Sequence, residues 1–335
     1  MAGTLAVISQ SGKSLSFFDV TSGERTAQMS DLIAEPHELC FDSKRNLLYL
    51  SHAYRHGHFW VHGDCSHEIS VIDPVKKEVI YTIDVRPVLS PHGLVIDKQR
   101  DILYTSFEED VNGGTGGIIG IDLNTRKVIK RISSETKSHW FVMTHDGKKA
   151  FTCNKTAAFI SILDLENDRM IGKISVPGGV EEPAISIDGR FAFFPTPSMQ
   201  FGQQPEDPKV LVIDTTTNEI VKTVPLDLGA DSVHVTSQGK IMVGKYQFGK
   251  EGRLALYDPE SYALLGETEI GLLPLTLRST FDGATGFVAN IGAGTVSVVD
   301  LSSMKVLKTL EVDTEPTTGG ALQGAHGMAH FPMKL

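Results

Sequence analysis

Seven segments of the chain share one pattern of hydrophobic and polar positions. Each segment has an apolar triplet, an aspartate, a short polar turn and a second β-rich strand. Another pair of short strands precedes most copies, and no segment shows helical periodicity over a useful length. The seven segments are LSFFDVTSGERTAQM, SVIDPVKKEVIYTI, IGIDLNTRKVIKRI, SILDLENDRMIGKI, LVIDTTTNEIVKTV, ALYDPESYALLGET and SVVDLSSMKVLKTL.

The copies recur at intervals of about 40 to 55 residues, which is typical of four-stranded propeller blades and not of helical repeats. We therefore predict an all-β fold, a single seven-bladed β-propeller over residues 1–335, with strands A to D in each blade and A innermost. The sequence starts on a B strand, and the matching A strand lies near the C-terminus. A closing blade of about 1–33 plus 324–335 is expected to complete the ring and to hide the sheet edges.

Every copy carries an aspartate at the start of its polar turn. Such a side chain can accept hydrogen bonds from the amides of its own turn, so we interpret these residues as turn formers. They are Asp19, Asp73, Asp122, Asp164, Asp214, Asp258 and Asp300.

Two short segments, PHGLVID at 91–97 and DILYTS at 101–106, resemble the repeats of YVTN-type seven-bladed propellers. The VIDP…KVIKRI pattern strengthens the resemblance, which covers the whole chain. That superfamily includes lactonase-like and virginiamycin-lyase-like propellers, so the resemblance implies the fold and favours ring-opening lyases and lactonases by analogy. No residue role transfers from it, because one propeller fold hosts many chemistries.

Composition and charge narrow the classes of partner. The 335 residues carry a net charge of −10 and no basic stripe, so we expect no nucleic-acid partner. No run of 18 apolar residues occurs, which argues against a membrane span. The 3 cysteines lack CxxC spacing and signal neither a disulfide framework nor a thiolate zinc site. We expect a cytoplasmic protein and, because a closed ring offers no free sheet edge, a monomer or a weak homodimer.

The first residues of the A strands predict the functional centre. Counted back from the A–B turns, one position is mostly histidine or a carboxylate. It is occupied by His37, His92, His139, Glu181, Asp231, Leu275 and His326. Because A strands line the channel of a propeller, we expect four imidazoles and two carboxylates to meet at one mouth.

Histidines with carboxylates form a ligand set typical of transition metals. We therefore predict a divalent metal ion (Zn, Fe, Mn or Mg) held by His37, His92, His139 and His326. Clustered cationic imidazoles would repel one another, which favours the neutral, ligating form. Two alternatives stay open: metal-free acid–base chemistry, and an inert channel in which the histidines are structural.

Several B–C loops are long, and by topology they lie over the mouth that holds the histidines. They span residues 51–68, 107–117, 195–208 and 245–252. Long loops around such a channel are typical of a substrate pocket with a lid. The predicted substrate-binding residues are His52, Tyr246, Phe201, Phe248 and Trp140. Alternatively, the histidines of the first loop form an adventitious metal-binding tract, and each phenylalanine packs its own loop.

The predicted catalytic residues are Glu181, Glu182, Asp231, His234, Lys245 and Arg278. A carboxylate would act as general base, and Lys245 or Arg278 would stabilise negative charge. Arg278 could bind a substrate carboxylate or, equally, pair with Asp231. Strand alternation predicts that only one of Glu181 and Glu182 points inward.

We therefore predict a metal-dependent enzyme that acts on a small organic molecule as a lyase, an isomerase or a lactone hydrolase. Four histidines on a propeller axis are also the ligand set of iron-dependent carotenoid-type oxygenases, so a non-haem iron oxygenase is one alternative. A non-catalytic binding or scaffold propeller is the other, because many YVTN-type chains have no evident site.

Overall fold

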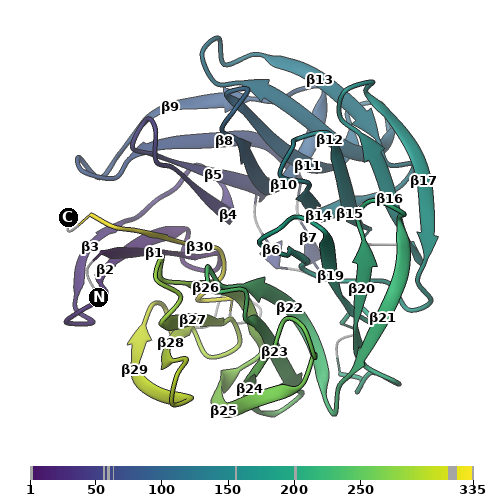
Figure 1. Ribbon diagram of the computed structural model, residues 1–335. Helices are drawn as coiled ribbons and strands as arrows, with labels where there is room; N and C mark the ends of the chain where they lie inside the picture. The colour runs from purple at the N-terminus through teal and green to yellow at the C-terminus, as the bar shows by residue number, and fades with distance from the viewer. Residues whose placement is uncertain are drawn as a thin grey trace.

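The computed structural model describes residues 3–55, 57–58, 61–62, 64–154, 157–199, 202–315 and 323–333. These residues form strands and turns without a helix, and seven four-stranded antiparallel sheets follow one another around a ring (Figure 1). The predicted all-β, seven-bladed propeller is confirmed. Within the described part of the chain, no helix is long and apolar enough to cross a membrane.

In each of the first six blades the chain runs from the innermost strand to the outermost. Blade 1 contains β4 (Glu35–Asp42), β5 (Leu47–Tyr54), β8 (Cys65–Asp73) and β9 (Glu78–Asp84). Between β5 and β8 lies a small hairpin of β6 (Gly57–His58) and β7 (Val61–His62). Blade 2 contains β10 (Val88–Asp97), β11 (Ile102–Asp110), β12 (Thr115–Asp122) and β13 (Val128–Ser133).

The next four blades repeat this order. Blade 3 contains β14 (Ser138–Met143), β15 (Lys149–Asn154), β16 (Phe159–Asp164) and β17 (Arg169–Ser175). Blade 4 contains β18 (Ala184–Ile185), β19 (Phe191–Thr196), β20 (Lys209–Asp214) and β21 (Glu219–Pro225). Blade 5 contains β22 (Gly229–Val235), β23 (Ile241–Gln247), β24 (Lys250–Tyr257) and β25 (Leu264–Leu272). Blade 6 contains β26 (Pro274–Ser279), β27 (Thr285–Asn290), β28 (Thr295–Asp300) and β29 (Lys305–Glu311).

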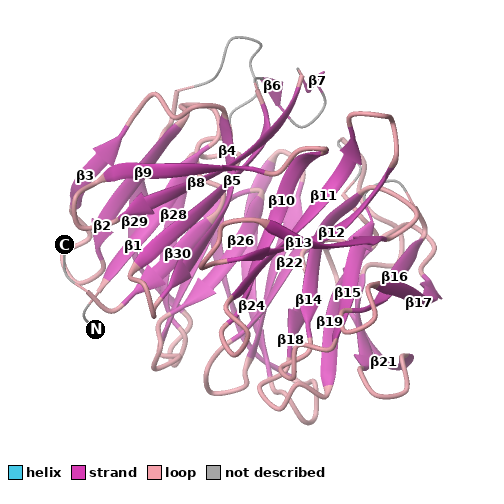
Figure 2. Cartoon of the chain, turned by 90° about the horizontal axis from the view of Figure 1, so that it is seen from above, coloured by secondary structure: helices cyan, strands magenta, loops and turns pink. Residues whose placement is uncertain are grey.

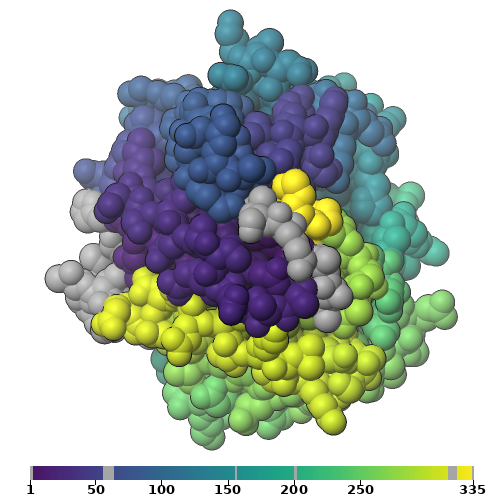
Figure 3. Space-filling view, turned by 90° about the vertical axis from the view of Figure 1, so that its left-hand side faces the viewer, coloured from purple at the N-terminus to yellow at the C-terminus, as the bar shows by residue number. Residues whose placement is uncertain are grey.

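The closing blade is built from segments near both ends of the chain. Its innermost strand is β30 (Met328–Phe331), followed outward by β1 (Thr4–Ser9), β2 (Ser14–Asp19) and β3 (Arg25–Met29). β1 pairs antiparallel with β30. The space-filling view shows yellow atoms of the C-terminal part against purple atoms of the N-terminal part (Figure 3). The predicted closure of the ring by terminal strands is confirmed.

The seven repeat aspartates form turns as predicted. In each turn, Oδ1 accepts hydrogen bonds from the amides two and three residues further on, over 2.6–3.2 Å. The fifth residue of each turn has a positive φ, for example 60° at Lys77. In the turns of Asp19, Asp73, Asp122, Asp214 and Asp258, the amide of this residue also donates to the aspartate carbonyl. One sequence feature thus fixes the same hairpin seven times.

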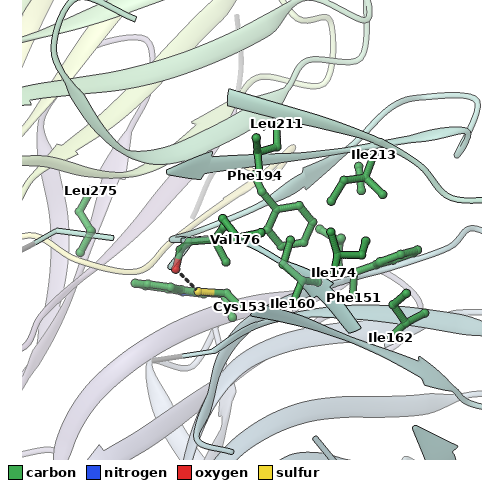
Figure 4. Packing of buried hydrophobic residues seen from close by; sticks show 14 of the residues in the cluster. Phe151, Cys153, Ile160, Ile162, Ile174, Val176, Phe194, Leu211, Ile213 and Leu275 are labelled. Atoms are coloured by element: carbon green, nitrogen blue, oxygen red, sulfur yellow. Dashed lines mark hydrogen bonds between the residues drawn. The ribbon is translucent and has the colours of Figure 1, made fainter. Parts of the chain in front are cut away.

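Apolar side chains fill the spaces between neighbouring blades. Phe151 and Ile160 of blade 3, for instance, belong to the same buried cluster as Phe194 and Ile213 of blade 4 (Figure 4). Similar clusters join the other blades. This packing sets the innermost strands at defined positions around the channel.

Candidate functional site

A β-bulge interrupts most of the innermost strands near their first residues. In β4 the pairing with β5 shifts register between Pro36 and Leu39, and β10, β14, β22 and β26 shift at equivalent places. A bulge breaks the alternation of a regular strand and re-aims its side chains. Two successive residues, such as His37 and Glu38, therefore both reach the centre of the ring.

The four histidines predicted as metal ligands lie together in the channel. Their ring centroids are 3.7 Å apart for His37 and His92, 3.7 Å for His92 and His139, and 4.4 Å for His37 and His326. All four side chains are buried. Burial and the neighbouring His37 lower the pKa of His326 to about 3, so this ring is neutral at pH 7. We call these four residues the histidine cluster.

Two serines hold the backbone of the histidine cluster in place. Ser51 of β5 accepts a hydrogen bond from the amide of Glu38 at 3.1 Å and donates to the carbonyl of His92, in the next blade, at 2.7 Å. Ser106 of β11 repeats the arrangement and donates to the carbonyl of His139. Each serine therefore links its own blade to the histidine of the following one.

Glu38 is a member of this site that the sequence pattern did not reveal. Its Oε1 accepts a hydrogen bond from Trp140 Nε1 at 3.1 Å, and it lies 3.5 Å from Nδ1 of His326 and 3.9 Å from Nδ1 of His37. Regular alternation predicts that the residue after an inward histidine points into the blade, and the bulge reverses that expectation. The carboxylate directly after the histidine in EPHE is the signal that could have found it.

Glu181 and Asp231 continue the ring beyond His139, and we call them the acidic pair. Both are buried, and the amide of Glu182 donates to the carbonyl of Asp231 at 2.9 Å, which ties the two segments together. Burial and the charge of Glu181 raise the pKa of Asp231 well above its ordinary value. Among the described residues, neither carboxylate oxygen of Asp231 has a hydrogen-bond partner.

Arg278 pairs with Glu182 and not with Asp231. Its guanidinium donates to Glu182 Oε1 at 3.0 Å and lies 3.8 Å from Glu38. Burial raises the pKa of Glu182 to about 7, although Arg278 opposes the rise. The other oxygen of Glu182 has no hydrogen-bond partner within the described chain.

Glu181 and Glu182 both reach the centre of the ring, contrary to the alternation argument. Glu182 contacts Arg278, and a carboxylate oxygen of Glu181 lies within 4.8 Å of a ring nitrogen of His139. The reason is that β18 begins only at Ala184, so the two glutamates precede the regular strand.

A pocket of about 440 Å³ reaches these residues from one end of the channel. Glu38, Trp140, Glu182 and Arg278 line its inner part, and later residues of β10 and β14 with their A–B turns line the rest. The B–C loops lie at the opposite ends of the strands, where the β6–β7 hairpin projects from the ring (Figure 2). This pocket therefore opens away from the loops that the sequence suggested as a lid.

Buried side chains occupy the loop end of the channel in blades 1 and 2. Tyr54, at the end of β5, donates its hydroxyl to Glu108 Oε1 at 2.7 Å, and both residues are buried. The Tyr54 ring lies 6.3 Å from that of His37. These contacts fill part of the space in which the sequence placed the substrate.

Comparisons with known proteins agree with this architecture. No protein-family model matches the chain. The uncharacterised protein YncE of Salmonella typhimurium is 24% identical over 224 residues, which are 65% of this chain and 56% of YncE. The match thus spans about half the length of that relative. The YncE of Salmonella typhi matches equally, at 24% over 224 residues.

Solved structures show the same fold over the whole chain. The periplasmic gluconolactonase PpgL of Pseudomonas aeruginosa superposes with a TM-score of 0.72 and 16% identity, covering 98% of this chain and 99% of PpgL. The chain therefore shares the fold of this protein along nearly its whole length. The dihydro-haem d1 dehydrogenase NirN gives a TM-score of 0.67 at 12% identity, covering 98% of the propeller and 75% of NirN. At these identities the likeness concerns the fold alone.

Among the residues that the structure describes, three groups of side chains have the spacing of a metal site. In each group, one potential ligand atom per residue lies within 4.8 Å of the others. The groups are His37 with His92 and His139, His37 with Glu38 and His326, and His139 with Cys153 and Glu181. Metal bonds of about 2 Å to nitrogen or oxygen are compatible with this spacing after small side-chain adjustments.

His52 lies outside the channel of the propeller, contrary to its predicted role in binding substrate. It is fully buried inside blade 1, with Nδ1 3.2 Å from the carbonyl of Ala34 and Nε2 2.8 Å from Ser70 Oγ. Because a carbonyl only accepts, Nδ1 carries the proton and Nε2 accepts from the serine. Burial lowers the pKa of His52 to about 4. Its two nitrogens are therefore committed to its own blade.

Lys245 also lies away from the channel, in the interior of blade 5. Its Nζ is 2.7 Å from Asp227 Oδ1 and 2.6 Å from Oε2 of Glu267, a residue of the outermost strand β25. Burial, which lowers its pKa, is outweighed by these two hydrogen bonds, so the pKa of Lys245 is raised. The lysine is thus a structural cation of its blade and does not face a substrate.

The remaining predicted residues lie at different depths. Tyr246 is fully buried, and burial followed by the charges of the acidic pair raises its pKa. Phe248 packs edge-on against Tyr246 at 5.2 Å. His234 contacts Ser279 Oγ at 3.0 Å through Nε2, and burial with Arg278 lowers its pKa to about 3. Phe201 lies outside the described residues.

Proposed function

We propose that this propeller is a metal-dependent enzyme that acts on a small polar organic molecule in the channel pocket, with lactone hydrolysis as the leading reaction. One observation carries the proposal: a carboxylate at the inner end of the pocket, that of Glu38, lies against the histidine cluster. Glu38 connects the pocket with the histidine cluster, because it lines the pocket and lies 3.5 Å from His326. The volume of about 440 Å³ is in the range of small-molecule sites.

The donor set fits a divalent ion beside the pocket. His37 belongs to two of the possible ligand groups, one completed by His92 and His139 and the other by Glu38 and His326. The lowered pKa of His326 keeps its nitrogen available for ligation. A bound ion would supply Lewis-acid polarisation of a carbonyl oxygen.

In the proposed lactone hydrolysis, Glu182 is the general base and Arg278 stabilises negative charge. Glu182, with one unpartnered oxygen and a pKa of about 7, takes a proton from water while the water oxygen bonds to the carbonyl carbon. The negative carbonyl oxygen then re-forms its double bond while the ring C–O bond breaks, and protonated Glu182 gives its proton to the ring oxygen, which yields a hydroxy acid. The guanidinium of Arg278 lies next to Glu182 and stabilises the negative charge on the carbonyl oxygen. The fold shared with a gluconolactonase supports this reaction by analogy only.

A second candidate is a non-haem iron oxygenase. Two histidines and one carboxylate with open positions form a ligand set typical of non-haem iron(II) oxygenases. His37, Glu38 and His326 make up such a group at the inner end of the pocket. Iron in the purified protein and oxygen uptake would favour this candidate over the hydrolase.

The proposal is tested on full-length protein purified with a tag that contains no histidine. Elemental analysis should find a divalent metal, and gluconolactone should be hydrolysed. His37→Ala should lose the metal and the activity, whereas His145→Ala, a change at an exposed histidine, should keep the metal. Glu182→Gln should keep the metal and slow hydrolysis about 100-fold or more. A folded protein without metal, or a His37→Ala variant that binds metal like the wild type, would overturn the proposal.

A further inference from the structure

A separate group of potential ligands lies on the other side of His139, at the junction of blades 3 and 4. Ligand atoms of His139, Cys153 and Glu181 lie within 4.8 Å of one another. The three residues come from β14, from β15 and from the segment before β18, and all are buried. None of these three residues lines the channel pocket, and the group shares only His139 with the histidine cluster.

Cys153 occupies a position at which the preceding blades have serine. Strand register aligns it with Ser51 and Ser106, the two serines that hold the histidine backbone. Like them it donates to a carbonyl of the next blade, that of Val180, at 2.6 Å (Figure 4). Since serine makes this bond in the neighbouring blades, the bond alone does not explain a sulfur atom.

Asp231 supplies an independent observation. Its side chain is 1% exposed, and among the described residues neither oxygen has a hydrogen-bond partner. A buried carboxylate without a partner is costly, and a second carboxylate next to it raises the cost. The backbone bond between Glu182 and Asp231 holds Asp231 beside the acidic member of the group. A cation bound next to Asp231 would offset this cost.

We propose that a divalent metal ion, zinc by the chemistry of its ligands, binds His139, Cys153 and Glu181, with the carboxylate of Asp231 as the fourth ligand. Thiolate, imidazole and carboxylate together are typical of zinc, and four protein ligands leave no open position, as in structural sites. His139 can serve this ion and the histidine cluster, because an imidazole has two nitrogens. The ion would join blades 3, 4 and 5 and does not depend on the proposed hydrolase activity.

The test is a cobalt titration of the metal-free full-length protein, because cobalt bound to a thiolate gives a charge-transfer band in the near ultraviolet. The chain has 3 cysteines, so the double variant Cys40→Ser with Cys65→Ser leaves Cys153 as its only thiol. We expect this double variant to keep the band and Cys153→Ser to lose it. Cys153→Ser should fold, because serine occupies the equivalent position in blades 1 and 2.

Further variants separate this site from the one in the pocket. Asp231→Asn should weaken cobalt binding at the thiolate site about 10- to 100-fold. His92→Ala should leave the thiolate band unchanged, because His92 is not part of this group. Cobalt binding without a thiolate band would overturn the second site and leave the proposed function intact. A band that is absent from the double variant but present in the wild type would assign the thiolate to another cysteine and also refute the inference.

Discussion

Replacing His52 with glutamine tests whether a buried histidine of this propeller is structural. The side chain is fully buried, donates to the carbonyl of Ala34 and accepts from Ser70. Glutamine can still accept from the serine but has no ring to titrate. Loss of the bond to Ala34 leaves a buried carbonyl unsatisfied, which should cost about 1–3 kcal/mol at neutral pH.

The pH dependence of that difference follows from the depressed pKa. His52 has a pKa of about 4 in the folded protein, against 6.5 for an ordinary histidine. As the pH falls below 6.5 the unfolded chain binds a proton that the folded chain does not, so the stability that neutral His52 contributes is lost progressively toward pH 4. At about 1.4 kcal/mol per pKa unit, the loss between pH 7.5 and pH 5 is about 2 kcal/mol.

Thermal unfolding of the two proteins at several pH values measures the effect. An unfolding entropy of about 2.1 cal/mol/K per residue over 335 residues converts 2 kcal/mol into about 3 °C in Tm. The wild type should therefore be more stable than His52→Gln at pH 7.5, and the gap should narrow by about 3 °C at pH 5. Val79→Ala, at an exposed position without a titrating group, is the control and should show a constant difference. A gap for His52→Gln that stays constant or widens in acid would refute the reasoning.

Two further changes test the remaining assignments. Lys245→Met should lower the free energy of unfolding by about 1–2 kcal/mol, because the bonds of Lys245 to Asp227 and Glu267 are lost. The metal content should not change, and a loss of metal would show that Lys245 contributes to the functional site. Arg278→Leu should destabilise the protein more at pH 8 than at pH 5, because at pH 8 Glu182 ionises without its partner. The expected loss in the free energy of unfolding at pH 8 is about 3–5 kcal/mol. Urea unfolding at both pH values measures this loss.

The sequence predicts the propeller well because its repeat is local. The turn aspartate, the apolar triplet before it and the strand after it lie within about 15 residues, and all seven turns form as expected. The proximity of the four histidines also follows from the repeat, since equivalent residues of neighbouring innermost strands must meet at the channel.

The contacts within the site depend on features that a regular repeat does not show. Glu38 reaches His326 because β4 has a bulge, and strand alternation gives no sign of that bulge. His52 and Lys245 lie near the ends of β5 and β23, the strands next to the innermost ones. Both side chains nevertheless find partners within their own blades. Their partners Ser70 and Glu267 lie on other strands, so the pairing depends on register across the sheet.

The end of the channel that holds the pocket could not be read from loop length. Long B–C loops suggest a lid over the histidines, but a long loop can also end on buried contacts. In blades 1 and 2, Tyr54 and Glu108 make such a contact at the base of the loops. The described pocket lies instead at the A–B turns, which are short in each of blades 1 to 6 and give no length signal.

The charges around the channel support the two proposals, a polar substrate at one place and a metal ion at another. Glu38 and Glu182 share Arg278, so the inner end of the pocket has both signs of charge. The guanidinium of Arg278 could exchange one of these carboxylate contacts for a contact with a substrate oxygen. Among the described residues, in contrast, neither carboxylate oxygen of Asp231 has a hydrogen-bond partner, and Asp231 lies beside the charge of Glu181. A substrate oxygen would add to the repulsion there, whereas a metal ion would remove it. The acidic pair is therefore suited to a cation, and Arg278 marks the place at which a negative oxygen can be bound.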